Sequence, residues 1–163
     1  NLSINFLPNC INDPADDLAS AQVAAETYSL TLDRIIFECR DSKSLDVDRA
    51  IHIFQEYRSL GFLTSLDHFG PTKASLELLP KFRPDFVKLG IGLVRNVDSD
   101  STKQRVVAYA LRYLRNLGIQ PIAVGVETFS ELDTLMSMSV ELFQGFLFAR
   151  PALERLAAPR FPA

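Results

Sequence analysis

The chain has 163 residues, 47% of them apolar, which is enough for one domain with a substantial core. The net charge is −3 and no run of Lys or Arg occurs, so we expect no binding of duplex nucleic acid. No apolar run approaches the roughly 18 residues of a membrane helix, and Cys10 and Cys39 lack a metal-binding spacing, so we expect a cytoplasmic protein without membrane contact by this segment.

Short apolar runs that end in a polar residue alternate with helical patterns along the chain. The predicted strands are Leu2–Phe6, Arg34–Cys39, Gly61–Asp67, Pro84–Leu89, Ile119–Gly125 and Val140–Phe146. The predicted helices are Ala15–Tyr28, Asp46–Leu60, Lys73–Phe82, Thr102–Leu117, Ser130–Met138 and a short one at Ala152–Leu156. Strict alternation of this kind favours parallel strands joined by right-handed crossovers, in the α/β class.

Two parallel α/β architectures compete for this pattern. A doubly wound open sheet usually has a glycine-rich phosphate turn after its first strand, but here that turn is Leu7-Pro8-Asn9. A TIM-type (β/α)8 barrel instead places a polar residue at the end of strand after strand, as this chain does. Because six strand–helix units are two short of eight, and the first strand begins at Leu2 without a lead-in, we predict an incomplete barrel that lacks its N-terminal portion.

Six polar side chains stand at or just beyond the predicted strand ends. They are Asn5, Glu38, Asp67, Lys88, Glu127 and Gln144. Oxygen ligands from separate strands suit Mg²⁺ or Mn²⁺, and a lysine opposite them suits polarisation of a phosphoryl oxygen or a bound water. Any one of these residues alone is better explained as the cap of a turn; the repetition over six ends is what favours a site.

The residues next to these strand ends leave further alternatives open. His68 is a ligand, a base or a turn residue, and without an evident partner the turn is favoured. Cys39 is expected on the opposite face of its strand from Glu38, packed against a helix. Arg40 shares the face of Glu38, which leaves a structural ion pair as the alternative to a metal site.

Six segments, taken in order, resemble motifs of the EAL family, the metal-dependent cyclic di-GMP phosphodiesterases built on a TIM barrel. The segments are Leu2-Ser3-Ile4-Asn5, Phe37-Glu38-Cys39-Arg40-Asp41, Leu66-Asp67-His68-Phe69-Gly70, Val87-Lys88-Leu89-Gly90, Ala123-Val124-Gly125-Val126-Glu127-Thr128 and Phe143-Gln144-Gly145-Phe146. They are similar to the family's S-x-N, E-x-T-E, D-D-F-G, K-I-D, A-E-G-V-E-T and Q-G-Y motifs. The resemblance implies a partial EAL-like domain over residues 1–163. Ser3–Pro8 and Leu142–Arg150 most resemble EAL domains fused to blue-light (BLUF) sensors.

The resemblance also implies roles for the retained residues. Asn5, Glu38 and Asp67 would bind Mg or Mn, with His68 as a further candidate ligand. Lys88 would be catalytic. The remaining two, Glu127 and Gln144, would bind the ligand.

Several family positions are substituted in this chain. Val124 stands at the position of the family's general base. His68 replaces the second aspartate of D-D-F-G, and Gly90 replaces the aspartate of K-I-D. Arg40 and Asp41 replace the threonine and second glutamate of E-x-T-E. The loop normally written T-G-Y-S-S is Pro71-Thr72-Lys73-Ala74-Ser75, and the glutamate of the EAL tripeptide, a metal ligand in the family, does not occur in these residues.

These departures predict a degenerate, catalytically impaired domain that acts in cyclic di-GMP signalling by binding the nucleotide or a regulatory protein. One alternative is an active Mg- or Mn-dependent phosphodiesterase that releases linear pGpG, with His68 as a substitute ligand. Another is a pure protein-interaction scaffold. A homodimer is expected in view of the family, through the helices that follow Asp67 or Gly125.

Overall fold

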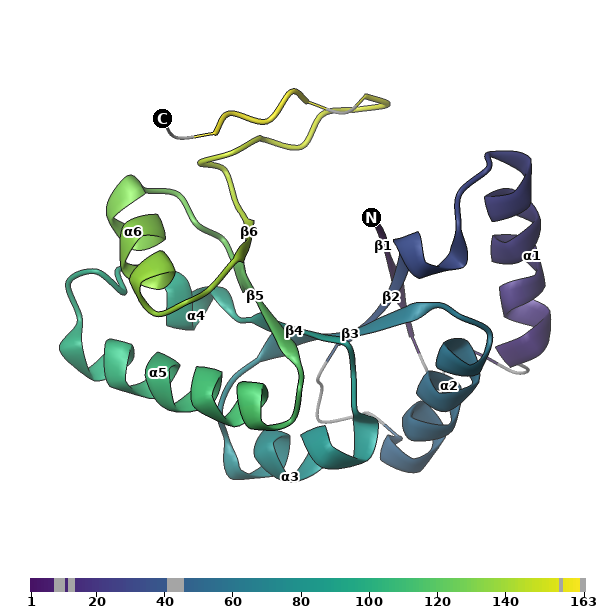
Figure 1. Cartoon of the computed structure of the whole chain (residues 1–163), viewed down its shortest axis with the longest axis horizontal. Helices are drawn as coiled ribbons and strands as arrows, with labels where there is room; N and C mark the ends of the chain where they lie inside the picture. The colour runs from purple at the N-terminus through teal and green to yellow at the C-terminus, as the bar shows by residue number, and fades with distance from the viewer. Residues whose placement is uncertain (8–10, 12–13, 41–45, 156, 162–163) are drawn as a thin grey trace. The chain divides into compact units, whose positions relative to one another are not determined.

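The structure is a computed structural model that describes residues 1–7, 11, 14–40, 46–155 and 157–161. The expected turn at Pro8–Asn9, Cys10 and the motif residue Asp41 lie outside the described residues. The strands, labelled in Figure 1, are β1 (Leu2–Phe6), β2 (Ile35–Arg40), β3 (Leu63–Phe69), β4 (Phe86–Leu89), β5 (Gln120–Val124) and β6 (Leu142–Gln144). The helices are α1 (Pro14–Thr27), η2 (Leu32–Arg34, 3-10), α2 (Val47–Ser59), α3 (Lys73–Phe82), α4 (Ile91–Val94), α5 (Ser101–Asn116) and α6 (Phe129–Ser137).

The strands form a sheet whose order is that of the chain, β1 to β6. The pairings of β1 with β2, β2 with β3, and β5 with β6 are all parallel. Each parallel step is bridged by a helix, as the alternation in the sequence predicted. The α/β class and the six strand–helix units are therefore confirmed.

Two compact units make up the chain. Unit 1 comprises Asn1–Asp67 and Thr72–Val87, and unit 2 comprises His68–Pro71 and Lys88–Ala163. The chain thus passes between the units after Asp67, after Pro71 and after Val87.

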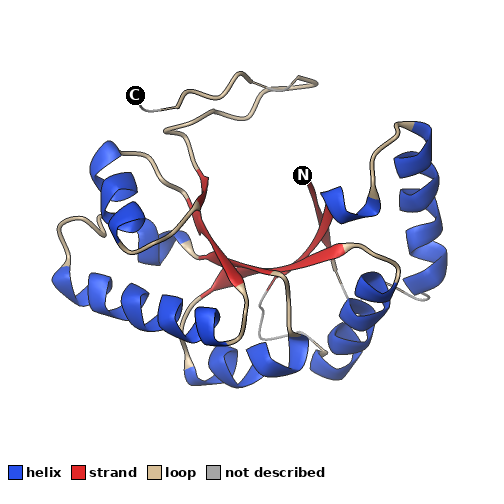
Figure 2. Ribbon diagram, viewed as in Figure 1, coloured by secondary structure: helices blue, strands red, loops and turns tan. Residues whose placement is uncertain are grey.

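The core of unit 1 lies between one face of β1 and β2 and the helices α1 and α2, which Figure 2 shows beside these strands. The rings of Phe6, Phe37 and Tyr57 pack with centroids 4.6 to 6.2 Å apart. Cys39 is fully buried against Ala50 and Phe54 of α2, so its expected packing against a helix is confirmed. Because side chains alternate along a strand, this packing turns the neighbouring Glu38 to the opposite face of the sheet.

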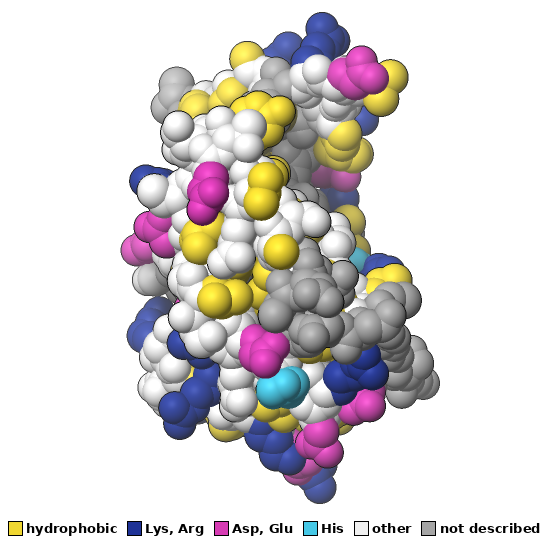
Figure 3. All heavy atoms as spheres, turned by 90° about the vertical axis from the view of Figure 1, so that its right-hand side faces the viewer, with side chains coloured by type: hydrophobic (Ala, Val, Ile, Leu, Met, Phe, Trp, Pro, Cys, Tyr) yellow, Lys and Arg dark blue, Asp and Glu magenta, His cyan; other side chains and the backbone are white. Residues whose placement is uncertain are grey.

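Exposed apolar side chains lie on α1 and directly after its end. Val23 is 63% exposed and Tyr28 is 83% exposed. The side of the molecule on which α1 and α2 lie, drawn in Figure 3, shows hydrophobic side chains interspersed with acidic and basic ones. None of the described helices is both long enough and apolar enough to cross a membrane.

Side-chain caps explain where the helices begin. The Asp100 carboxylate accepts hydrogen bonds from the backbone N–H groups of Thr102 and Lys103, each 2.9 Å long, at the start of α5. At α6 the side chain of Thr128 and that of Glu131 form a reciprocal capping box.

The structure corrects the prediction of a helix at 152–156. Residues 153–155 form a turn, and Glu154 has a left-handed φ of 53°, which a helix does not accommodate. A single turn of helix has little to offset its nucleation cost. The structure also contains two short elements, η2 and α4, that periodicity did not indicate, because one turn is too short to establish a period.

Candidate functional site

In unit 1, strand register brings the candidate metal ligands to one face of the sheet. Asn5 and Glu38 are register partners on β1 and β2, so their side chains leave the same face. Asp67 pairs with Arg40, two positions beyond Glu38 on the same face. Glu38 is only 3% exposed, whereas Asn5 is exposed and Asp67 is half-buried.

The chemical types of these side chains suit a divalent cation. An amide and two carboxylates are the oxygen donors that Mg²⁺ and Mn²⁺ prefer. The hydroxyl of Ser65, the register partner of Glu38 on β3, is buried without a hydrogen-bond partner among the described residues, which marks a place where a polar ligand or water is expected. The donors are few, however: the described residues contain no group of three or more His, Cys, Asp or Glu that could hold a metal.

His68 follows Asp67 within β3, near the end of the strand. Its φ is 59°, in the left-handed region that favours glycine, asparagine and aspartate, and its side chain is exposed. This backbone departs from regular strand geometry although His68 belongs to β3, so the expectation of a turn residue is met in its backbone conformation alone. An aspartate, the family residue, is among the residue types best tolerated in this conformation.

In unit 2, the Glu127 carboxylate is paired with an arginine. The Arg95 guanidinium binds both carboxylate oxygens, with Nη1–Oε2 and Nη2–Oε1 distances of 2.6 Å each. This hydrogen bonding lowers the pKa of Glu127 and raises that of Arg95. Glu127 is thus held ionised and oriented by a residue that lies 32 positions earlier in the chain.

Glu131 holds the loop that carries Glu127. Its buried carboxylate, only 1% exposed, accepts hydrogen bonds from the backbone N–H groups of Asn96, Glu127 and Thr128 at 2.9, 2.9 and 3.2 Å. Burial alone would raise the pKa of Glu131, but these hydrogen bonds together with Arg95 lower it. The loop after β5 and the segment after α4 are therefore both hydrogen-bonded to the Glu131 carboxylate.

Val124 and Gln144 end adjacent strands as register partners. The carbonyl oxygen of Gln144 accepts hydrogen bonds from the N–H groups of Gly125 and Val126, at 2.7 and 3.1 Å. The side chain of Gln144 remains exposed, while Val124, at the family's general-base position, is half-buried. Lys88 on β4 is 8% exposed and so lies in the protein interior rather than in solvent.

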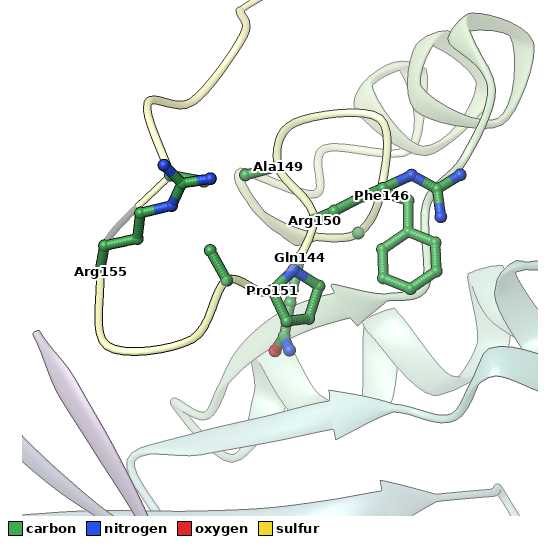
Figure 4. Close-up of a pocket in the computed structure, with 9 residues that line it drawn as sticks. Gln144, Phe146, Ala149, Arg150, Pro151 and Arg155 are labelled. Atoms are coloured by element: carbon green, nitrogen blue, oxygen red, sulfur yellow. The ribbon is translucent and has the colours of Figure 1, made fainter.

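A pocket of 390 Å³ opens beside Gln144 in unit 2. It is lined by Gln144, Gly145, Phe146, Ala149, Arg150, Pro151, Ala152, Arg155 and Ala157. The Arg150 guanidinium stacks 4.6 Å from the centre of the Phe146 ring, and Figure 4 shows Arg155 on the other side of the pocket from this pair. The lining has two cationic groups, an amide and an aromatic ring, but no acid, so it suits an anion with a planar group.

The sequence did not single out Arg95, Glu131, Arg150 or Arg155 as functional. Glu131 could have been found, because Thr128-x-x-Glu131 is a capping-box signature. The arginines carry no such signal, since none of them ends a strand.

The EAL domain family matches residues 1–151, so the chain belongs to the EAL domain family. Its six strand–helix units are those of the TIM-type barrel that the sequence predicted. The chain is 30% identical over 162 residues to the blue light- and temperature-regulated antirepressor BluF of Escherichia coli, covering 99% of this chain and 40% of that protein.

Two solved structures resemble the chain along nearly its whole length. One is the c-di-GMP bound form of a standalone versatile EAL protein from Vibrio cholerae O395, with a TM-score of 0.91 and 38% identity over 98% of this chain and 68% of the other. The second is BlrP1 of Klebsiella pneumoniae in a calcium/cyclic di-GMP complex, with a TM-score of 0.86 and 34% identity over 98% of this chain and 41% of BlrP1. The chain therefore spans well under half of BluF and BlrP1.

Proposed function

We propose that this chain is an EAL domain that acts in cyclic di-GMP signalling by binding the nucleotide, with impaired hydrolysis. The pocket beside Gln144 carries this proposal. Its arginines can take phosphate groups, and the stacked Arg150–Phe146 pair offers a flat surface for a guanine base. Cyclic di-GMP is present in the related structures from Vibrio cholerae and Klebsiella pneumoniae.

Hydrolysis is expected to be impaired because the residues that would transfer protons are replaced or bound to another side chain. Val124 cannot accept a proton from water, and losing a general base slows catalysis by about 10²–10⁴-fold. Glu127 is not a ready substitute, because its carboxylate is committed to Arg95 and its pKa is lowered, which makes it a weaker base.

Some of the family's machinery is nevertheless retained. Asn5, Glu38 and Asp67 would hold Mg or Mn, which would stabilise negative charge on a phosphoryl group when bound. The ammonium of Lys88 would polarise a phosphoryl oxygen or a bound water. Because these groups are retained, we expect the protein to keep nucleotide binding although its hydrolysis is impaired.

Calorimetric titration of the protein with cyclic di-GMP, with Mg²⁺ and then with EDTA, tests the binding. We expect saturable binding, weakened by EDTA if Asn5, Glu38 and Asp67 build a cation site. Binding that EDTA leaves unchanged would mark a metal-independent receptor. Absence of binding in both conditions would overturn the proposal.

Chromatographic detection of linear pGpG tests the impairment. The wild-type protein should release pGpG slowly or not at all, and Val124→Glu combined with His68→Asp should raise the rate by at least about 100-fold. Val124→Gln with His68→Asp is the matched control, since glutamine has the shape of glutamate but is not a base. Magnesium-dependent hydrolysis by the wild type at a rate that Val124→Glu does not change would support an active phosphodiesterase instead.

A second candidate function is binding of a regulatory protein. It is favoured by the similarity to an antirepressor along 99% of the chain. Helix α5 offers a surface for it, with Val106 and Tyr109 exposed by 37% and 49% and the Arg112 guanidinium over the Tyr109 ring. Replacement of Tyr109 by Glu should weaken the contact with a regulatory protein without changing nucleotide affinity. Sedimentation of the protein alone checks the homodimer expected through the helices that follow Asp67 or Gly125.

A further inference from the structure

We propose that Arg155 and Arg160 add a phosphate subsite to the pocket beside Gln144, specific for a terminal phosphate group of a linear nucleotide. This inference rests on the nucleotide binding proposed above. Both arginines follow residue 151, where the match to the EAL domain family ends. They therefore lie outside the residues that the family match covers.

The backbone returns these arginines to the pocket. The N–H group of Arg160 donates a 2.8 Å hydrogen bond to the carbonyl oxygen of Phe148. Phe148 is fixed in turn by its N–H bond of 3.1 Å to the carbonyl of Gly145, next to Gln144. The chain after Pro151 thus folds back onto residues 145–148.

A second hollow of 410 Å³ lies where the segment returns, and Arg155 lines both hollows. The second is lined by residues 146–152 together with Arg155, Ala157, Ala158 and Arg160. Arg150, Arg155 and Arg160 bring three cationic groups to it, and none of its lining residues is acidic. In a chain of net charge −3, such a concentration of positive charge favours an anionic ligand.

The charges of the two phosphate types decide which nucleotide is favoured. Each phosphodiester of cyclic di-GMP carries one negative charge, whereas a terminal phosphomonoester carries about 1.5 to 2 at neutral pH. Guanidinium groups bind phosphate oxygens in pairs, and two of them can surround a terminal phosphate. Among the described residues, Arg155 and Arg160 form no salt bridge that would compete for these hydrogen bonds.

Titrations with pGpG, GpG, cyclic di-GMP and inorganic phosphate separate the sources of phosphate. We expect Arg155→Gln with Arg160→Gln to weaken pGpG binding at least about tenfold, because charged hydrogen bonds are lost, and to leave GpG, which lacks the terminal phosphate, unchanged. The matched control is Arg105→Gln with Arg115→Gln on α5, which removes the same charge from an exposed helix. Competition by inorganic phosphate against pGpG, but not against GpG, would identify the terminal phosphate as the recognised group.

The outcomes separate this inference from the proposed function. Equal pGpG affinity in the wild type and in the Arg155–Arg160 variant overturns the subsite and leaves nucleotide binding intact. An equal loss in the α5 control also overturns it, since the effect is then one of net charge. Absence of binding of every nucleotide to the wild type overturns the proposed function and the subsite together.

Discussion

Among the glycines, Gly145 is the one at which an added Cβ atom would meet the closest backbone atoms. A Cβ atom there would lie against the backbone of Val126, 2.5 Å from its nitrogen and closer still to its carbonyl oxygen. Backbone atoms cannot move aside as the end of a flexible side chain can. The same glycine follows Gln144 and its carbonyl fixes Phe148 and Ala149, so the shape of the pocket depends on it.

Gly145→Ala is therefore expected to destabilise the protein by about 1–3 kcal/mol or more and to weaken nucleotide binding. Gly92→Ala is the control, because no atom lies within 4 Å of its added Cβ and alanine suits helix α4. Urea unfolding followed by circular dichroism measures both. Similar stability for the two variants would show that the backbone at Gly145 can rearrange.

At the scale of elements, α6 and the loop before it depend on the ionised carboxylate of Glu131. The folded protein lowers the pKa of Glu131 below its ordinary value of 4.5. A group with a lowered pKa stabilises the fold at pH values above 4.5, and this contribution is lost as the pH falls through the folded-state pKa. The stabilisation is therefore present at neutral pH and absent in acid.

Glu131→Gln is expected to lower the free energy of unfolding by about 1–3 kcal/mol at pH 7, since an amide cannot replace both acceptor oxygens. The difference from the wild type should shrink as the pH falls below 4.5. Denaturant unfolding at a series of pH values measures this. Glu77→Gln is the control and should have little effect, because Glu77 is an exposed residue of α3 whose ion pair in the described part of the chain is with Lys73, at 3.8 Å. A stability difference between Glu131→Gln and the wild type that stays constant across pH would contradict the assignment.

Elements with local signals were predictable from the sequence. Asp46, Asp100 and Thr128 cap α2, α5 and α6, which begin within a residue or two of their expected starts. The helix expected at 152–156 was wrong: Glu154 has a left-handed backbone, and the chain beyond it is hydrogen-bonded back to Phe148, a contact that no local pattern encodes.

The candidate site was predictable only where it follows strand ends. The common face of Asn5 and Glu38 follows from parallel pairing, and the sequence placed both at strand ends. The pairing of Arg95 with Glu127 joins residues 32 apart and depends on how α4 and the loop after β5 pack. A contact of this kind produces no pattern that can be recognised in a single sequence.

At the scale of the whole molecule, the candidate residues are divided between the two units. Unit 1 holds Asn5, Glu38 and Asp67, the oxygen donors. Unit 2 holds Lys88, Gln144 and the arginine-lined pocket. We therefore expect the cation to bind residues of unit 1 and the nucleotide to bind residues of unit 2.

Hydrogen exchange followed by mass spectrometry tests this division. Mg²⁺ alone should protect amides of β1–β3, and cyclic di-GMP in EDTA should protect β5, β6 and residues 145–149. Potassium chloride at equal ionic strength is the control for the effect of salt. Nucleotide protection confined to β1–β3 would contradict a pocket in unit 2.

The interleaving of the units has a consequence for synthesis on the ribosome. Unit 1 takes all but four of the first 87 residues, with only 68–71 belonging to unit 2. Chains emerge N-terminus first, and domains tend to fold as they emerge. The strands that carry Asn5, Glu38 and Asp67 can therefore assemble once Val87 has emerged, before Gln144 and the arginines of the pocket are synthesised. In a nascent chain, the proposed cation binding would precede the proposed nucleotide binding.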